Sequence, residues 1–391
     1  MNKENELTKF QLLVMAISAG VCVANIYYNQ PILKEIATTF NTTESEVGII
    51  SILAQAGYGI GLFFLTPYGD KTNRKNLIMI LQAVLIAALL GMTFIENLTG
   101  IYFMSLFIGV PAVAAQVILP MAASLTTKDR GKSVGFIFTG ILVGILAARV
   151  LSGYIADWLN WRYVFGIAAG MEFVTLLMVY FTLPNVKTEF KGNYLHLLKS
   201  TLQQLKRFPV LQRSALLGAL VFGIFCSFWT TLTFHLSGAP FNYNSDIIGL
   251  FGLLGIAGAL LAPIFGKIAD KGNPETTLIG TVAIIIISSL CLKFFPDSLI
   301  AILISVVLLD VGVQATQVIN VATIYTLDQN ANSRINTVYM TSYFIGGALG
   351  TSAGVWMWHL GAWQMVTNQI LLWSILGLIV AIIHLKKSKS A

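Results

Sequence analysis

The chain has 391 residues, of which 56% are hydrophobic and only 10% are charged, and its mean hydropathy is +0.78. This composition excludes a soluble domain and is typical of a protein that lies mostly in lipid. The formal net charge of +7 is interpreted as a topology signal and a contact with anionic membrane lipids, and a nucleic-acid partner is not expected.

Apolar runs of about 20 residues, the length that a helix needs to cross a membrane, recur along the chain. The first run is longer than a signal-peptide core and no small-residue cleavage site follows it, so it is expected to remain as the first span. The sequence therefore predicts an all-α membrane protein with twelve transmembrane helices, at about 11–32, 46–66, 77–96, 99–124, 134–156, 163–183, 212–237, 247–269, 276–295, 298–324, 336–359 and 363–385.

The basic residues predict the orientation, because short loops rich in Lys and Arg stay on the cytoplasmic side. With the N-terminus inside, every Lys and Arg is cytoplasmic except Lys34, Arg162 and Lys293 in outer loops and Arg149 within a span. We therefore expect a multi-pass protein of the inner membrane whose two termini are both cytoplasmic.

The second half of the chain repeats landmarks of the first with a shift of about 200 residues, as expected for a duplicated transporter. The matched pairs are 66–71 and 266–271, 115–118 and 316–319, and Trp161 and Trp363. This repeat predicts two pseudo-symmetric six-helix halves, residues 1–184 and 212–391. A polar, basic cytoplasmic linker, residues 185–211, joins them.

One loop carries the most specific motif. Asp70-Lys71-Thr72-Asn73-Arg74-Lys75 resembles the Asp-Arg-x-Gly-Arg-Lys loop of the major facilitator superfamily, and the resemblance covers essentially the full chain. Asn73 replaces the usual glycine, and Asn also adopts left-handed backbone conformations. The resemblance implies the major facilitator fold and a secondary transporter with alternating access.

Two further patterns narrow the resemblance. Arg130-Gly131 followed by Gly140, Gly144 and Gly153 is similar to the fifth helix of the drug:proton antiporter branch. The Tyr-Asn-Gln-Pro motif at 28–31, with Leu-Ala-Ala-Arg at 146–149, resembles the bacterial arabinose-efflux-like permeases.

One position departs from the antiporter branch, which commonly carries an arginine in helix 4 where this chain has Ser105. Either Arg149 or Asp310 takes over the proton-coupling role of that arginine, or the transport is not coupled to protons.

Asp310 lies near the middle of the tenth predicted span. A charge at the bilayer centre costs about 2.5–3.5 kcal/mol on insertion scales, so such carboxylates normally face water, a partner or a proton path. Asp310, Gln314 and Gln317 fall within about 60° of each other on a helix and predict a polar stripe. Helix 10 lines the central cavity of the family it resembles, which places the stripe at the substrate. The alternative is a neutral carboxylic acid bonded between helices.

Arg149 and Glu172 are further ionisable residues within spans, and both are proton-coupling candidates beside Asp310. They lie at similar depth on neighbouring helices, so one interpretation pairs them structurally. Gly140 and Gly144 occupy the helix face opposite Arg149, and small residues mark tight packing. Arg149 is then directed elsewhere, either as the anchor of an anionic substrate or as the partner that releases the proton of Asp310.

The resemblance implies a gate at the cytoplasmic ends of helices 2 and 8, with Asp70, Lys71, Arg74 and Asp270 as its residues. A carboxylate can satisfy the free N–H groups at the start of a helix. We expect Asp70 to meet the helix that begins near Asn336, and Asp270 the helix near Ser133; the alternative is ordinary interfacial charge.

Several polar and aromatic residues within the spans are candidates for substrate contact, and Asn25, Tyr28 and Asn29 share a face of helix 1 by their spacing. Packing between helices is the alternative for each one. Together with Arg149 the candidates are Asn25, Tyr28, Asn29, Gln55, Gln116, Trp229, Thr230, Gln314, Gln317 and Asn320.

The sequence contains no metal-ligand cluster, phosphate loop or nucleophile-base arrangement, so we expect neither an enzyme nor a cofactor or metal site. We predict a monomeric transporter that exports a small organic molecule in exchange for protons. A proton-linked importer, a uniporter and a membrane sensor that binds a ligand without moving it are the alternatives.

Overall fold

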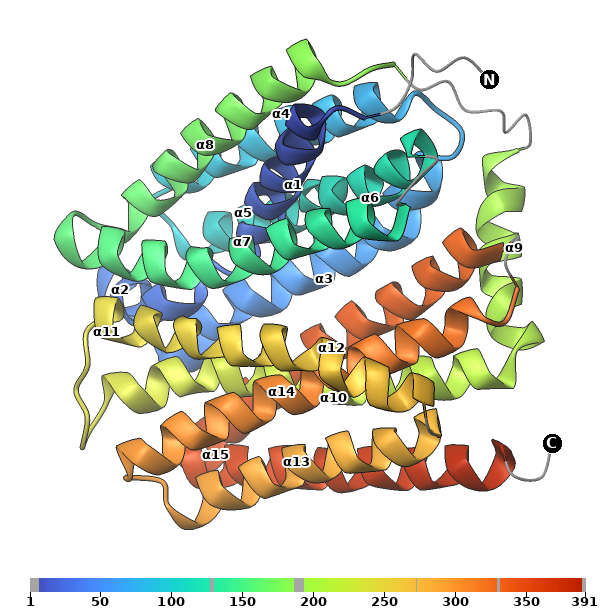
Figure 1. Cartoon of the computed structure of the whole chain (residues 1–391). Coiled ribbons are helices and arrows are strands. Elements are labelled where there is room, and N and C mark those ends of the chain that lie inside the picture. The colour runs from blue at the N-terminus through green and yellow to red at the C-terminus, as the bar shows by residue number, and fades with distance from the viewer. Residues whose placement is uncertain (1–6, 127–129, 186–192, 272, 329–330, 389–391) are drawn as a thin grey trace.

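The computed structural model describes residues 7–126, 130–185, 193–271, 273–328 and 331–388, and these residues form helices joined by short connections (Figure 1). The longer helices are α1 (Lys9–Ala24), α3 (Glu44–Tyr68), α4 (Arg74–Phe94), α5 (Leu98–Gly109), α6 (Ala114–Leu125), α7 (Arg130–Trp158), α8 (Trp161–Thr182), α9 (Tyr194–Arg207), α10 (Pro209–Ser237), α12 (Gly255–Lys271), α13 (Pro274–Phe294), α14 (Leu299–Tyr325) and α15 (Asn332–Ser388). Shorter elements are η2 (Gln30–Ile32), α2 (Leu33–Phe40), η3 (Pro111–Val113), α11 (Ser245–Leu250) and η4 (Phe251–Leu254).

Within the described residues, nine helical segments are long and apolar enough to cross a membrane, and two shorter apolar helices accompany them. One of the nine joins two predicted spans, because α15 runs through the non-helical residues Gly361 and Ala362. The shorter apolar helices, Lys9–Ala24 and Ser245–Gly258, fall in the first and eighth predicted spans.

Three predicted spans are interrupted, which sequence periodicity did not indicate. The first α-helix ends at Ala24, and residues 25–29 form turns before η2. The fourth span bends at Pro111, whose missing N–H cannot join the helical ladder. The eighth span passes through the 3₁₀ turns of η4, which contain a single glycine, Gly252.

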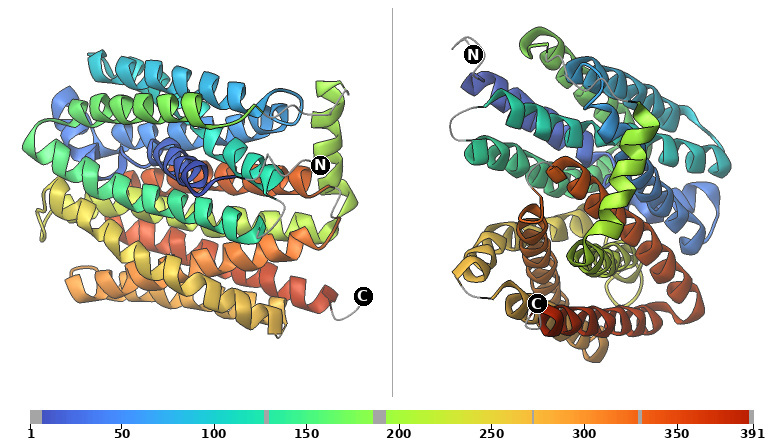
Figure 2. Two further views of the ribbon diagram at one scale, coloured as in Figure 1. Left: turned by 45° about the horizontal axis from the view of Figure 1, so that its top comes forward. Right: turned by 90° about the vertical axis from the view of Figure 1, so that its right-hand side faces the viewer.

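Helices α1–α8 and helices α10–α15 form two groups that lie side by side, in blue to green and in yellow-green to red (Figure 1). Both termini lie at one end of the bundle, which we call the terminal end; the opposite end is the distal end. Helix α9 lies across the terminal end, roughly perpendicular to the bundle (Figure 2). It falls in the predicted linker, of which residues 186–192 lie outside the described residues.

The two groups meet along two seams. In the first, α3 packs against α15, and Thr351 donates a hydrogen bond to Gln55 Oε1 (2.8 Å). In the second, α7 packs against α11 and η4. A Cβ atom on Gly249 would lie 2.5 Å from the carbonyl oxygen of Arg149, so these backbones approach as closely as only glycine allows.

Candidate functional site

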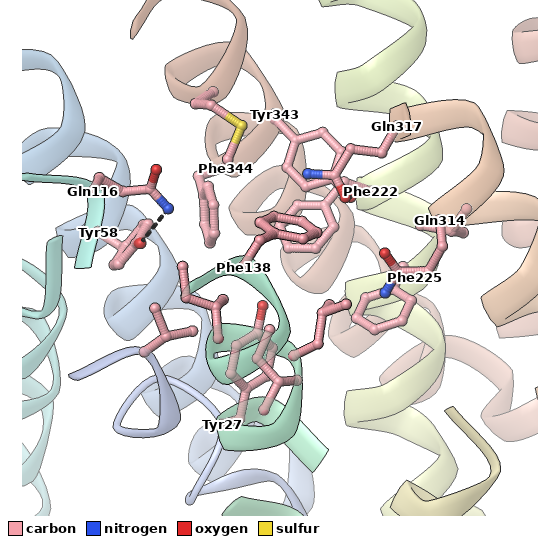
Figure 3. Close-up of a pocket in the computed structure, with 16 residues that line it drawn as sticks. Tyr27, Tyr58, Gln116, Phe138, Phe222, Phe225, Gln314, Gln317, Tyr343 and Phe344 are labelled. Carbon is pink, nitrogen blue, oxygen red and sulfur yellow. Dashed lines mark hydrogen bonds between the residues drawn. The ribbon is translucent and has the colours of Figure 1, made fainter. Parts of the chain in front are cut away.

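A cavity of about 60 Å³ lies between the two helix groups, and Figure 3 shows the side chains around it. Its polar lining consists of Gln116, Gln314 and Gln317. Its aromatic lining comes from both groups and consists of Tyr27, Tyr58, Phe138, Phe222, Phe225, Tyr343 and Phe344. The chemistry of this lining, aromatic walls with a few amides, suits an organic molecule that has apolar faces and some hydrogen-bonding groups. Small-molecule sites measure about 300–1,000 Å³, so this cavity has to widen to admit one.

Two of the three glutamines are held in place by neighbouring phenols. Gln116 donates to the Tyr58 hydroxyl (3.2 Å), and the Tyr343 hydroxyl donates to Gln317 Oε1 (3.3 Å). The ring of Tyr343 stacks on Phe222 with centroids 4.0 Å apart. These contacts orient polar groups without consuming all of their hydrogen-bonding capacity.

A smaller pocket adjoins this cavity and is lined by both Arg149 of α7 and Asp310 of α14. The two side chains are buried and interact electrostatically, although they form no direct ion pair. Arg149 donates from Nε to Gln30 Oε1 (2.9 Å), and its guanidinium lies over the Trp229 ring, 3.8 Å from the centroid. An uncompensated charge at this depth is costly, so the two groups depend on one another.

Several buried atoms in this pocket and next to the Arg149 side chain lack a hydrogen-bond partner. They are the donors Arg149 Nη2, Gln30 Nε2 and Trp229 Nε1 and the acceptor Asp310 Oδ2. The Trp229 N–H lies near the Asp310 carboxyl but without normal hydrogen-bond geometry. Buried polar groups are ordinarily satisfied. The pocket measures about 10 Å³, space for no more than one water, so a polar ligand group reaches these unpaired atoms only if the pocket widens.

Glycines of the eighth span allow Arg149 and Asp310 to come this close. A Cβ atom on Gly252 would lie 2.9 Å from Arg149 Cβ, and one on Gly255 would lie 3.3 Å from Asp310 Oδ2. Gly258 packs on the backbone of Asp310. Larger residues there would separate α7 and α14 from the broken helix between them.

The predicted stripe of Asp310, Gln314 and Gln317 lies on the cavity side of α14. The alternative pair of Arg149 with Glu172 is not formed. Glu172 instead accepts a hydrogen bond from the Cys22 thiol (3.0 Å), inside α1–α8. Similar depth did not bring the two charges together because Arg149 is directed toward Gln30 and Trp229. The glycine face of α7 packs closely, as its small residues indicated, and its partner is α1, with Gly144 against Gly20.

Seven candidates for substrate contact lie outside the lining of the cavity and of the smaller pocket: Asn25, Tyr28, Asn29, Gln55, Trp229, Thr230 and Asn320. The helical spacing of the first three does not apply, because the α-helix ends at Ala24. Asn29 accepts a hydrogen bond from Ser51 (2.6 Å), and Gln55 bonds Thr351, so these amides tie helices together. Thr230 and Asn320 are fully buried. Ser105 is buried too and bonds the carbonyl of Ile101.

At the terminal end, Asp70 accepts a hydrogen bond from Ser333 in the first turn of α15 (3.3 Å) and pairs with Arg74 (2.9 Å). Arg74 also donates to the carbonyl of Pro120 and thereby connects this loop to α6. Lys71 is exposed beside them. The side chain of Asp270, predicted to act at the matching position, lies outside the described residues.

The sequence interpretation missed Gln30 and the aromatic lining. Gln30 belongs to the Tyr-Asn-Gln-Pro motif and follows the candidates Tyr28 and Asn29, so the motif itself was the available signal. Aromatic residues within spans give no such signal, since most of them face lipid or the core.

The chain is similar to known transporters over most of its length. It is 37% identical over 368 residues to the "Uncharacterized transporter YgaY" of Escherichia coli O157:H7, covering 94% of this chain and 93% of that protein. It is 23% identical over 358 residues to a Helicobacter acinonychis protein named "Probable sugar efflux transporter", covering 89% and 88% of the two chains.

Among solved structures, the fold resembles a bacterial homolog of the human lysosomal transporter Spinster in an inward-facing, occupied conformation. The TM-score is 0.78 at 12% identity, over 97% of this chain and 96% of that one. The likeness at this identity concerns the fold. The family model of the Major Facilitator Superfamily matches residues 15–351. The protein is therefore a multi-pass membrane transporter, not an enzyme, and the chain belongs to the Major Facilitator Superfamily.

Proposed function

We propose that this protein exports a small organic molecule in exchange for protons, by alternating access between two six-helix halves. The observation that supports it most directly is the buried pair of Arg149 and Asp310 beside an aromatic and amide-lined cavity. The negative charge of a carboxylate that lies next to a guanidinium and a pocket can be compensated in two ways, by the cation or by a bound proton. Those two states are what proton coupling requires.

The mechanism follows from the partners of Asp310. When Asp310 is ionised, it interacts with Arg149 and can accept a hydrogen bond from a substrate through Oδ2. When a proton arrives from the outer side, Oδ2 ceases to be a free acceptor and the attraction to Arg149 is lost. Protonation then weakens substrate binding, so that proton entry and substrate exit alternate.

We assign twelve spanning helices to this cycle, with α15 counted as two spans and the broken first, fourth and eighth spans as one each. The terminal end carries Lys71, Arg74, Lys199 and Lys206 and is proposed to be cytoplasmic. The halves are residues 1–184 and 212–391, and residues 185–211 link them. The protein is proposed to act as a monomer in the inner membrane.

The structure corresponds in this proposal to an occluded state, in which the halves are in contact at both ends. At the outer, distal end Lys34 donates to the carbonyl of Ser237 (2.7 Å), and Trp358 donates to Glu44 (2.6 Å). Asp70 and Ser333 hold the cytoplasmic end of the α3–α15 seam. Alternating access requires such contacts to form and break at opposite ends.

The test is substrate-dependent proton flux in proteoliposomes with a pH dye inside, for wild type and Asp310→Asn. A panel of anionic metabolites, sugars and cationic drugs is added outside. We expect at least one compound to drive proton movement in wild type. Asp310→Asn, which resembles the protonated acid, is expected to fold, to bind that compound more weakly and to move no protons. Proton-coupled transport retained by Asp310→Asn would remove Asp310 from the mechanism.

The same experiment separates the other functions of this fold. Substrate movement in the direction of the proton flux would indicate a proton-linked importer. Movement without proton flux would indicate a uniporter, and binding without any movement a sensor.

A further inference from the structure

A second buried carboxyl, Glu172 of α8, lies away from the cavity in a cluster formed by three helices. Its Oε1 accepts a hydrogen bond from the thiol of Cys22 in α1, with Sγ and Oε1 3.0 Å apart. Gln82 of α4 donates to Thr175 Oγ1, one turn further along α8 (3.1 Å). Glu172, Gln82 and Cys22 are each 0% exposed. The cluster therefore joins α1, α4 and α8 where no water reaches.

The surroundings of Glu172 offer no positive charge. The titratable groups that interact with it are the thiol of Cys22 and the phenol of Tyr28, both from α1. Among the residues that the structure describes, no Lys, Arg or His forms an ion pair with Glu172.

The basic residues of the helices packed around it are held elsewhere. Arg149 of α7 bonds Gln30, and Lys75 of α4 donates to the carbonyl of Leu183. Arg162, at the start of α8, donates to the carbonyl of Thr93. An ionised Glu172 would be a desolvated charge without a counter-charge, and a group in that position is neutralised instead.

The hydrogen-bond inventory of the cluster leads to the same result. Two of its buried oxygens, Glu172 Oε2 and Gln82 Oε1, have no partner, and both are acceptors when Glu172 is ionised. A proton on Oε2 turns one of the two into a donor. The protonated cluster then has one unsatisfied acceptor instead of two and gains a donor, which lowers the cost of burying it.

We propose that Glu172 binds a proton in this cluster and is a neutral carboxylic acid in the present conformation. This is a proton-binding site separate from the Arg149–Asp310 pocket, and it holds α1, α4 and α8 together through neutral hydrogen bonds. It does not rest on the proposed transport reaction, because the proton is bound whether or not the protein moves a substrate.

The experiment is infrared spectroscopy of the full-length protein in lipid nanodiscs at neutral pH, with and without ¹³C-labelled glutamate. We expect the carbonyl stretch of a protonated carboxylic acid, shifted by the label and lost in Glu172→Gln. Asp310→Asn is the control for the other buried carboxyl and is expected to retain the label-sensitive band. An unchanged band in Glu172→Gln, or no such band in wild type, would overturn the proposal.

Unfolding temperatures supply a second measurement that does not depend on band assignment. A glutamine amide resembles a neutral carboxylic acid in shape, so Glu172→Gln is expected to unfold within a few degrees of wild type. Glu172→Ala removes the acceptor of Cys22 and is expected to unfold at a clearly lower temperature. If Glu172→Gln were as destabilised as Glu172→Ala, the neutral-acid assignment would be wrong.

Discussion

Asp310 and Glu172 have much in common, and their differences are informative. Both are buried carboxyls within predicted spans, and each has one oxygen without a hydrogen-bond partner. Asp310 faces a guanidinium and an indole and borders a pocket, whereas Glu172 faces a thiol and an amide inside one helix group. Burial alone therefore does not mark a coupling residue. The charge of the neighbours and access to a cavity decide which carboxyl can exchange its proton during transport.

The largest effect is expected when Asp310 loses its neighbouring cation, Arg149, because Glu172 has no such cation to lose. Arg149→Gln leaves Asp310 without the nearby positive charge, which costs at most about 3–5 kcal/mol, the cost of a broken direct pair, unless Asp310 takes up a proton. We expect lost proton-coupled transport and a lower unfolding temperature. The double variant Arg149→Gln with Asp310→Asn should regain stability but not transport. A double variant no more stable than Arg149→Gln would show that the two charges are independent.

The next prediction concerns the glycine that admits Asp310. A Cβ atom on Gly258 would lie 2.9 Å from the carbonyl carbon of Asp310, and that backbone cannot move without shifting α14. We expect Gly258→Ala to cost about 1–3 kcal/mol of stability through overpacking and to reduce transport. Gly280→Ala in α13 is the matched control, because a Cβ atom there meets nothing within 4 Å. Equal behaviour of the two variants would contradict the close packing at Asp310.

A smaller effect is expected in the cavity. Tyr343→Phe removes the hydroxyl that donates to Gln317, and one hydrogen bond contributes about 0.5–1.5 kcal/mol. We expect an apparent KM for substrate that is about two- to tenfold higher, measured by initial transport rates. Tyr339→Phe, one turn away and outside the cavity lining, is the control and should leave KM unchanged. The reverse result would place the substrate elsewhere.

The smallest effect comes from a third carboxyl with an unpartnered oxygen, Glu35 of α2, at the distal end. Burial raises the pKa of Glu35 above its usual value, while a hydrogen bond from Ser245 and the charge of Lys34 oppose the shift. The folded state therefore favours the protonated carboxyl. Its contribution to stability is present below the unfolded pKa and is lost as the pH rises through the folded pKa.

Thermal unfolding of wild type and Glu35→Gln across mildly acidic pH checks this sign. We expect the wild type to lose stability relative to Glu35→Gln as the pH rises, by a small amount because Glu35 is partly exposed. Parallel curves for the two proteins would show that Glu35 does not contribute to the closed distal end.

The helices were largely predictable, because the length of an apolar run and the position of basic loops are local properties of the chain. The stripe of Asp310, Gln314 and Gln317 was predictable as well, since α14 is regular and its spacing holds. The helical-spacing argument for Asn25, Tyr28 and Asn29 does not hold, because α1 ends at Ala24, and their contact with substrate stays a prediction. The pairing of Arg149 was open, because depth along two helices does not specify how either helix is rotated.

The sequence by itself determined that this protein lies in a membrane, and it contained the loop motif of its family and the glycines of α7. These follow from composition and spacing, which act over a few residues. Only the tertiary structure decided that Arg149 meets Gln30, Trp229 and Asp310, while Glu172 is left with Cys22 and Gln82. That choice depends on close approaches such as Gly249 on α7 and Gly258 on α14, and on the rotation of whole helices. Packing between residues distant in sequence sets both the close approaches and the rotation of the helices.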